Sequence, residues 1–297
     1  MGTSPHSESD SDQVGAIGRV IGRLGDYQTK DWLLSRGLYL ISASVLLFLW
    51  IPLIVMLLLS FGENAITIFP FEGFTLDYYV AMLNDERLLL SAWRSIQIAT
   101  ISATIATVLA VPASFALARF EFPLKETYRI FGILPLIVPG VVLGMALLIY
   151  FRTVLGVTPG LMTILLTHGV YGFPFVLLVV TARLYSFDEA LEEAARDLGA
   201  GPVATFRDIT LPIIAPAVAA GFLFAWLRSF EDFIRVFFVR GTINVLTTTM
   251  YSMIQYGAST KMNAISSIIV IAIALVLVVA VVLGSVNQFV GDTTEDE

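Results

Sequence analysis

Few side chains in this chain could do chemistry. One candidate group is the pair of adjacent carboxylates Glu231 and Asp232. The chain has no cysteine and only two histidines, His6 and His168. The lack of cysteine excludes disulfides, thiolate metal sites and cysteine nucleophiles, and two histidines are too few for a histidine metal cluster. The phosphate-binding pattern Gly-x-x-x-x-Gly-Lys-Ser/Thr and the zinc pattern His-Glu-x-x-His do not occur. We therefore expect no catalytic residue, no metal site and no cofactor on this chain. If ATP is used, another chain must bind it.

The two carboxylates are flanked by aromatic residues, Phe230 and Phe233. Adjacent negative charges attract a cation, and aromatic faces add cation–π contacts. This pattern predicts a place where a cationic substrate passes. The alternative is that the carboxylates end a helix in water or form ion pairs with neighbouring arginines, Arg228 or Arg235.

The elements that position these residues are apolar helices. Of the 297 residues, 57% are hydrophobic and 14% are charged, whereas soluble domains carry about 25% charged residues. A helix needs about 20 apolar residues to cross a bilayer. We therefore predict an all-α membrane protein, with six transmembrane helices inside residues 37–290. The predicted spans are 38–61, 95–118, 131–151, 161–182, 212–230 and 266–289.

Three features inside or between these spans need an explanation. The apolar piece 233–239 is too short to span, so it is expected to be interfacial or re-entrant. The third span holds Pro135 and Pro139, which permit a kink, and glycines at 140 and 144, which allow close helix packing. His168 lies inside the fourth span, where an ionisable residue is a functional candidate. A neutral imidazole bonded to a helix carbonyl would explain it equally well.

Polar segments set the expected orientation. Residues 1–36 are polar and lack an apolar core, so we expect a cytoplasmic tail and no cleavable signal peptide. With the N-terminus inside, ten of the seventeen basic residues fall in cytoplasmic segments. Both termini would then lie in the cytoplasm of a prokaryotic cell. The net charge is −7 and both tails, including 291–297, are acidic. This indicates either solvated disordered ends or adaptation to a salty cytoplasm.

Residues 186–211 interrupt the apolar pattern with a charged helical hairpin. Ser186 and Glu189 have the spacing of a capping box, and Glu192 precedes Arg196 by four, which favours a surface ion pair. Gly199 suits the left-handed residue that ends a helix. Apolar or small residues recur with helical spacing, which predicts one continuous stripe: Phe187, Ala190, Leu191, Ala194, Ala195 and Leu198.

The second arm of the hairpin leads into the membrane. Pro202 suits the first turn of a second short helix, and Pro212 sits where the fifth span begins. Periodicity alone leaves two interpretations open. The stripe either packs on the membrane or on its own bundle, or it grips a soluble partner.

The hairpin resembles the signature of the inner-membrane permease subunits of binding-protein-dependent ABC importers. That signature is Glu-Ala-Ala, three residues, Gly, nine residues and Ile-x-Leu-Pro, matched without a gap by Glu193, Ala194, Ala195, Gly199, Ile209, Leu211 and Pro212. The resemblance implies a type I importer permease fold in which this loop is a coupling helix. The coupling helix would dock on a cytoplasmic ABC ATPase dimer that binds ATP and Mg, with Ala190, Leu191 and Leu198 as further contacts. It also implies a second permease subunit of similar fold, an extracytoplasmic substrate-binding protein, the lipid bilayer around both permeases, and no nucleic acid.

A finer resemblance points to the second permease subunit of spermidine/putrescine importers. It rests on residues 74–79, 191–199, 229–238 and 251–257. It implies polyamines as substrates, while thiamine, ferric iron, phosphonate and sulfate permeases share much of the pattern. A self-contained secondary transporter or an intramembrane enzyme would need buried charges in several spans, and the spans hold few.

Overall fold

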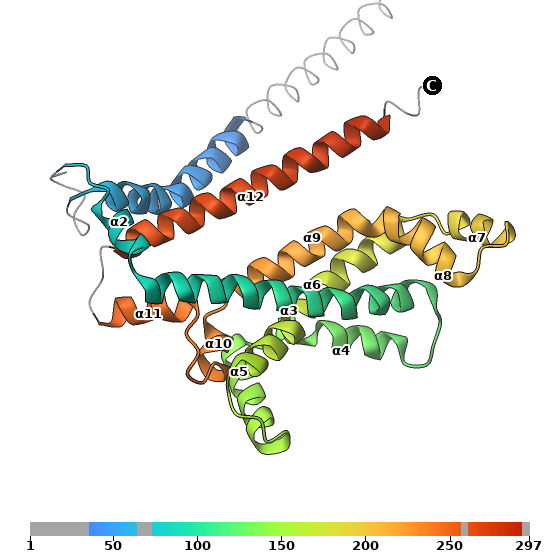
Figure 1. Cartoon of the computed structure of the whole chain (residues 1–297). Helices are drawn as coiled ribbons and strands as arrows, with labels where there is room; N and C mark the ends of the chain where they lie inside the picture. Colours follow the sequence, from blue (N-terminus) through green and yellow to red (C-terminus); the bar gives the residue numbers. More distant parts are fainter. Residues whose placement is uncertain (1–35, 64–72, 257–260, 293–297) are drawn as a thin grey trace, which may run out of the picture. The chain divides into compact units, whose positions relative to one another are not determined.

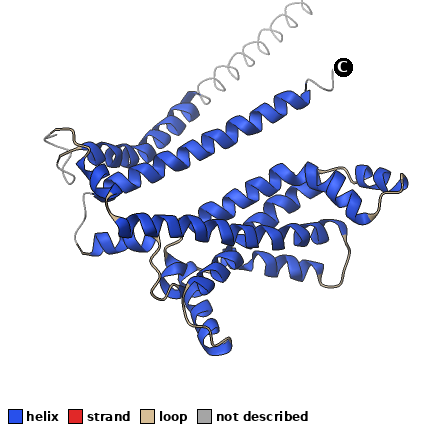
Figure 2. Ribbon diagram, in the orientation of Figure 1, coloured by secondary structure: helices blue, strands red, loops and turns tan. Residues whose placement is uncertain are grey.

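The computed structural model describes residues 36–63, 73–256 and 261–292, and in that part of the chain the regular elements are helices (Figures 1 and 2). One isolated bridge joins Gly62 and Phe74. The predicted polar tails, 1–36 and 291–297, lie almost entirely outside the described residues. The chain divides into two compact units, one of Met1–Tyr78 with Asn263–Glu297 and one of Tyr79–Met262.

The first unit contains the first and last apolar helices. The first predicted span corresponds to the helix Arg36–Phe61, and the last lies within α12 (Lys261–Asp292). The first helix exposes large apolar side chains along most of its length. Such exposure suits a lipid surface, because hydrocarbon tails are as apolar as these side chains.

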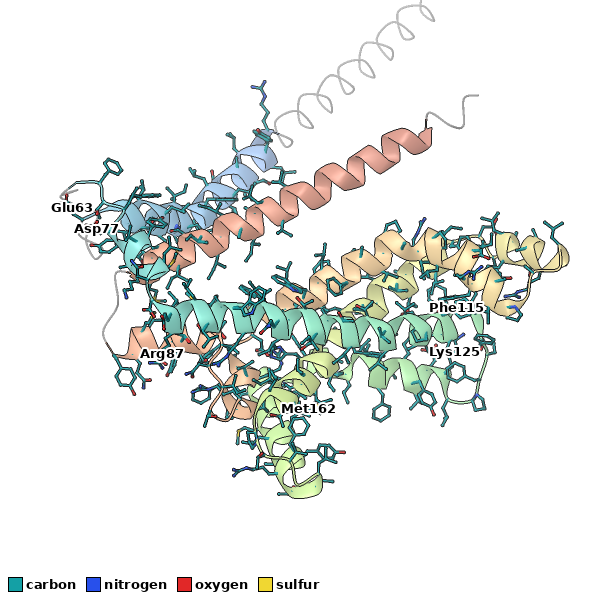
Figure 3. The ribbon with its side chains drawn as sticks, viewed as in Figure 1. Glu63, Asp77, Arg87, Phe115, Lys125 and Met162 are labelled. Carbon is teal, nitrogen blue, oxygen red and sulfur yellow. The ribbon has the colours of Figure 1, made fainter. Side chains whose placement is uncertain are left out.

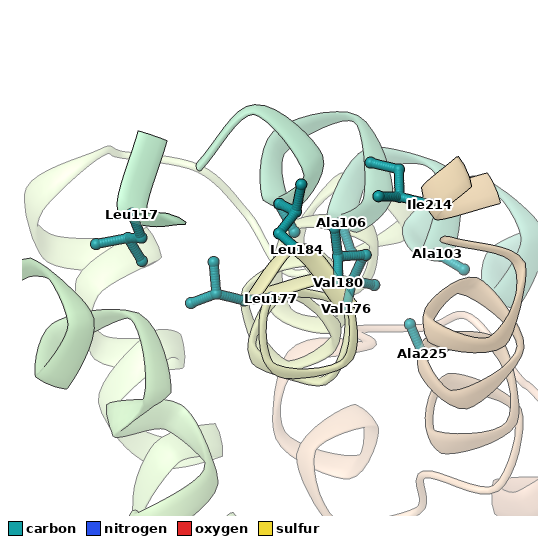
Figure 4. Packing of buried hydrophobic residues seen from close by; sticks show 10 residues of the cluster. Ala103, Ala106, Leu117, Val176, Leu177, Val180, Leu184, Ile214 and Ala225 are labelled. Carbon is teal, nitrogen blue, oxygen red and sulfur yellow. The ribbon is translucent and has the colours of Figure 1, made fainter. Parts of the chain in front are cut away.

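Three long helices form the core of the second unit: α3 (Glu86–Arg119), α6 (Leu161–Ser186) and α9 (Leu211–Phe230). They meet around Gly172, where an added Cβ would lie 3.2 Å from the Cβ of Ala225 and 3.3 Å from that of Ala106. Figure 4 shows this buried cluster, to which α6 contributes Val176 and Val180. Small residues let the helix backbones approach closely, as expected for packing in a membrane.

The third predicted span is broken into two helices. α4 (Lys125–Ile137) and α5 (Gly140–Ile149) are separated at Val138 and Pro139, and the two parts are bent by 106°. Proline restricts the residue before it to extended conformations, and Val138 has φ −71° and ψ 126°. The predicted kink is therefore a complete break, and 131–151 is not one continuous helix.

Short helices complete the second unit. They are α2 (Asp77–Leu83), the π-helical turn η1 (Tyr150–Val154), α10 (Ile234–Val239) and α11 (Leu246–Gln255). The predicted short apolar piece 233–239 is α10, which packs on α5. An added Cβ at Gly144 would lie 2.8 Å from the Phe238 ring and 3.2 Å from the Cα of Arg235. The close approach predicted from the glycine spacing is confirmed.

The described residues include four helices long and apolar enough to cross a membrane, or five if the bent pair α4–α5 is one span. The count of six remains a prediction, because the side chains of the last part of α12 are not described.

The hairpin consists of α7 (Ala190–Asp197), α8 (Pro202–Thr205) and the π-helical turn η2 (Phe206–Thr210). The predicted second short helix is present as α8, and it continues through η2 into α9 as one helix over Pro202–Phe230. In η2 the N–H of Leu211 donates to the carbonyl of Phe206, five residues back. Pro212 has no N–H to donate and its ring crowds the carbonyl four residues earlier. A wider π turn accommodates both effects.

Candidate functional site

The turn of the hairpin forms as its sequence indicates. Gly199 follows α7 with φ +91°, the left-handed conformation that favours glycine. Its N–H donates to the carbonyl of Arg196 at 2.9 Å. Pro202 occupies the first turn of α8. The predicted helix end at Gly199 and the predicted helix start at Pro202 are both confirmed.

The start of α7 differs from the prediction. Ser186 is the last residue of α6, and its hydroxyl donates to the carbonyl of Arg183 at 2.9 Å. The N-cap residue is Glu189, which makes no side-chain cap, and Oδ1 of the preceding Asp188 accepts from the N–H of Ala190 at 3.0 Å. The predicted Ser186–Glu189 capping box is wrong, because α6 continues through the position where a new helix was expected to begin.

The hairpin buries one charged residue and exposes several apolar ones beside its remaining charged residues. Glu192 is fully buried, whereas Leu198 is 91% exposed, Val203 80% and Leu191 52%. The expected surface pair of Glu192 with Arg196 is wrong. Packing of the apolar stripe on its own bundle is also wrong within the unit Tyr79–Met262, where most of the stripe faces outward.

Two groups donate hydrogen bonds to the buried carboxylate of Glu192. The Nε of Arg119, at the end of α3, lies 2.9 Å from Oε2. The hydroxyl of Thr210 in η2 donates to Oε1 at 2.6 Å. Close by, the ring of Phe206 packs edge-on against that of Phe115 of α3, with centroids 5.2 Å apart. Phe115 is labelled in Figure 3 at the hairpin end of α3.

The other residues predicted to dock the ATPase divide into two sets. Near the turn, Glu193, Ala194 and Ala190 are exposed and Ala195 is half-buried. In the helix that leads to α9, Ile209 and Leu211 are half-buried and Pro212 is exposed. The first set, with Leu191 and Leu198, forms the outer face of the hairpin, and the second set belongs to the helix that supports it.

The carboxylate of Asp232 is the centre of a buried cluster at the other end of α9. Its Oδ1 accepts from Nη1 of Arg235 at 2.8 Å, and its Oδ2 lies 3.4 Å from Nε2 of His168. Nδ1 of His168 lies 2.5 Å from the hydroxyl of Ser229. The prediction that His168 bonds to a helix carbonyl is wrong, because its Nδ1 contacts a hydroxyl and its Nε2 faces a carboxylate. α9 has 20 residues, so about 30 Å of helix separates this cluster from the hairpin.

Glu231 sits outside the buried cluster, exposed and ion-paired with Arg228. Arg228 also donates through Nη2 to the hydroxyl of Tyr171 at 2.8 Å. Both carboxylates therefore form ion pairs, Glu231 with Arg228 and Asp232 with Arg235, as the alternative interpretation predicted. Sequence reasoning missed Tyr171. The available signal was a polar aromatic residue inside an apolar span, since a buried tyrosine hydroxyl usually has a partner.

The two flanking aromatic residues belong to different groups. Phe230 stacks on Trp226 with ring centroids 5.2 Å apart. Phe233 lies 4.8 Å from Tyr251 and 5.6 Å from Phe237, measured between centroids. Among the described residues, no three His, Asp or Glu side chains are grouped so that they could hold a metal ion.

Long apolar helices with exposed apolar faces, packed around small residues, define an integral membrane protein of the helical-bundle class. Residues 110–291 match the family model described as "Binding-protein-dependent transport system inner membrane component". The chain belongs to this family, and it is a permease component of a binding-protein-dependent transport system.

Curated relatives agree with this assignment. The spermidine/putrescine transport system permease protein PotC of Escherichia coli (strain K12) is 33% identical over 261 residues, which cover 88% of this chain and 97% of the relative. The putrescine transport system permease protein PotI of the same organism is 30% identical over 236 residues, covering 77% of this chain and 84% of the relative.

Solved structures share the fold at lower identity. A chain of a bacterial alginate ABC transporter, in complex with a periplasmic protein bound to an alginate pentasaccharide, has a TM-score of 0.67 at 19% identity. The match covers 84% of this chain and 93% of that one. A chain of the methionine transporter MetNI in an inward-facing conformation has a TM-score of 0.55 at 20% identity, covering 67% and 95% of the two chains.

Proposed function

We propose that this chain forms half of the translocation pathway of a polyamine importer and is driven by a separate ABC ATPase that docks on the hairpin. The chain itself has no catalytic role in this proposal, since ATP and Mg are bound by the ATPase dimer. A second permease subunit of similar fold supplies the other half of the pathway. An extracytoplasmic binding protein delivers the substrate.

The polarity of the hairpin carries the docking proposal. A helix that only packed on its own bundle would bury its apolar stripe and expose its charges. Here Glu192 is buried, and Leu191, Leu198 and Val203 are exposed. The side chains of Ala190 and Ala194 on the outer face are small, so the backbone of a partner can approach closely. Docking on a cytoplasmic ATPase requires the hairpin to lie inside the cell, which agrees with the distribution of basic residues.

The polyamine proposal rests on the relatives and on the chemistry near Glu231. Spermidine and putrescine are flexible cations, which carboxylates and aromatic faces bind together. Glu231 is the accessible carboxylate, and its partner Arg228 is also partly exposed. An exposed ion pair contributes little stability, so a cationic substrate can displace Arg228. Asp232 is buried and its Oδ1 pairs with Arg235, so it supports the site without contacting substrate in this state.

The substrate is tested with the complete complex reconstituted in liposomes. We expect ATPase stimulation by a binding protein loaded with spermidine or putrescine, and uptake of the same cation. Stimulation and uptake with thiamine, ferric iron, phosphonate or sulfate, and none with polyamines, would reject the polyamine assignment while leaving the permease class intact.

Docking is tested separately by placing a charge on the outer face of the hairpin. Leu198→Asp should abolish co-purification of the ATPase. Tyr256→Asp is the matched control, because Tyr256 is similarly exposed (86%) but lies after α11. Retention of the ATPase by the Leu198→Asp variant would reject the docking surface.

A further inference from the structure

Glu192, Arg119 and Thr210 come from three elements and meet beneath the hairpin; together they are called the Glu192 clamp. We infer that the Glu192 clamp is the link through which movement of the docked hairpin reaches α3 and α9. This inference rests on the proposed docking function and adds positioning residues to it. None of the three side chains would contact the ATPase or the substrate.

The geometry of the clamp makes it stiff. The side chains of Arg119 and Glu192 are 7% and 0% exposed, and Thr210 is fully buried. Each carboxylate oxygen of Glu192 has one short partner, at 2.9 Å and 2.6 Å. Charge-assisted hydrogen bonds are strong and directional. They are not weakened by water at a dry site. α7 therefore cannot shift relative to α3 or η2 without breaking one of them.

Neighbouring contacts tie the same point to the rest of the bundle. The guanidinium of Arg119 lies 5.4 Å from the ring centroid of Phe187, which directly follows α6. Thr210 is the last residue of η2, which runs into α9 without a break. The clamp thus joins the hairpin to the ends of the three helices that form the core of this unit.

The position of Glu192 on α7 separates two surfaces of one short helix. The neighbouring residues Leu191 and Glu193 face outward, where the partner would bind. Glu192 faces inward and holds the bundle. A push on the outer face is therefore delivered to Arg119 and Thr210. Buried charge pairs are often no more stabilising than apolar side chains of the same size. The distinctive contribution of the clamp is fixed geometry, which coupling requires.

The experiment measures substrate transported per ATP hydrolysed, using the complete complex in liposomes. Two variants loosen the clamp while limiting the risk of misfolding. Arg119→Met with Glu192→Leu removes both charges together and keeps the volume filled. Thr210→Val removes a single hydroxyl. We expect both complexes to assemble with their ATPase and to hydrolyse ATP, with transport per ATP reduced roughly 2- to 30-fold, the range observed for residues that link two sites.

A matched control removes a carboxylate at the same end of the molecule. Glu121 is 90% exposed and pairs with Lys125, so Glu121→Gln should leave transport per ATP unchanged. Restored coupling in the charge swap Arg119→Glu with Glu192→Arg would support the clamp further. Unchanged transport per ATP in Thr210→Val, together with unchanged coupling in any assembled double variant, overturns the inference. That result is distinct from failure of docking, which Leu198→Asp reports through loss of the ATPase.

Discussion

The guanidinium carbon of Arg235 lies 3.3 Å from the centroid of the Tyr171 ring, so a residue of α10 rests on a side chain of α6. The hydroxyl of the same tyrosine accepts from Arg228 of α9. One aromatic residue therefore holds two arginines, one on its ring face and one at its edge. The position of the short helix α10 depends on this contact and on the ion pair between Arg235 and Asp232.

Replacing Tyr171 should separate these two roles. Tyr171→Phe keeps the ring and removes the hydroxyl, with an expected cost of about 1 kcal/mol. Tyr171→Leu also removes the buried cation–π contact, which adds about 2 kcal/mol. Thermal unfolding of the purified protein in detergent measures both. Equal midpoints for the two variants would show that the ring face of Tyr171 does not stabilise Arg235.

The stability of the protein should depend strongly on the charge of Asp232 and weakly on that of Glu231. Asp232→Asn leaves Arg235 without its buried counter-charge, so we expect a loss of about 3–5 kcal/mol in stability and poor assembly. Glu231→Gln affects an exposed pair and should cost less than about 1 kcal/mol. Denaturant unfolding in micelles provides the comparison. Similar losses for the two variants would contradict the buried position of Asp232.

Glu231 should instead affect transport. If it attracts the cationic substrate, Glu231→Gln raises the KM of polyamine uptake while the amount of assembled complex stays constant. The effect should weaken at high salt, because exposed charges are screened. Unaltered uptake kinetics at low salt would exclude Glu231 from the pathway.

Two glycines at the hairpin turn offer a matched pair of substitutions. Gly199 has φ +91°, whereas Gly201 has φ −71°, and neither has an atom within 4 Å of an added Cβ. Gly199→Ala should therefore destabilise the turn by about 1–2 kcal/mol through its backbone alone, and reduce ATPase stimulation by substrate-loaded binding protein. Gly201→Ala should have little effect. Hydrogen exchange of the amides in α7 reports the turn directly, and equal protection in both variants would refute the prediction.

The start of α3 should be sensitive to acid. Burial raises the pKa of the Asp85 carboxyl, but hydrogen bonds from Lys261 and from the N–H of Leu88 outweigh it and hold this pKa below its ordinary value. A lowered folded pKa contributes stability above the unfolded pKa of about 3.9. That stability, about 1 kcal/mol or less for a partly exposed pair, is lost as the pH falls below about 4.

Asp85→Asn is the informative variant for this pH dependence. Asparagine caps a helix about as well as aspartate, so the helix start is retained while the titrating group is removed. The decline in unfolding midpoint below about pH 4 should become shallower. An identical decline in the variant would assign the acid sensitivity to other groups.

Much of the fold could be predicted from local sequence patterns. Apolar runs located the helices that became α3, α6 and α9, since a span of about 20 apolar residues has few alternatives. Gly199 and Pro202 marked the hairpin turn, because their backbone requirements are local. The glycine pair in α5 predicted a close helix contact, and the structure shows that the partner is α10.

The orientation of the hairpin could not be predicted in this way. Helical periodicity tells which residues share a face, but not which face is buried. The partner of Glu192 is Arg119, 73 residues away in the chain, and no local pattern signals that contact. The burial of Asp232 could not be predicted for a similar reason. Its contact with His168 links α6 to the end of α9, and local sequence does not indicate such a contact.

The bend angle between α4 and α5 is also larger than the prolines alone predict. Proline predicts a missing hydrogen bond, and the angle then depends on what the second segment packs against. Here α5 lies on α10, where Gly144 lets Phe238 approach.

The π turn between the hairpin and α9 has a consequence for how the length of this helix can vary. Such a turn holds one residue more than an α-helix would need at the same place. Loss of one residue between Phe206 and Thr210 can therefore be absorbed by relaxation to ordinary α-helix, with both ends keeping their orientation. The same loss within α9 would rotate everything beyond it by about 100° and carry Ala225 away from Gly172. The extra residue lets this short stretch absorb the loss of one residue, while the rest of the helix is held to one length.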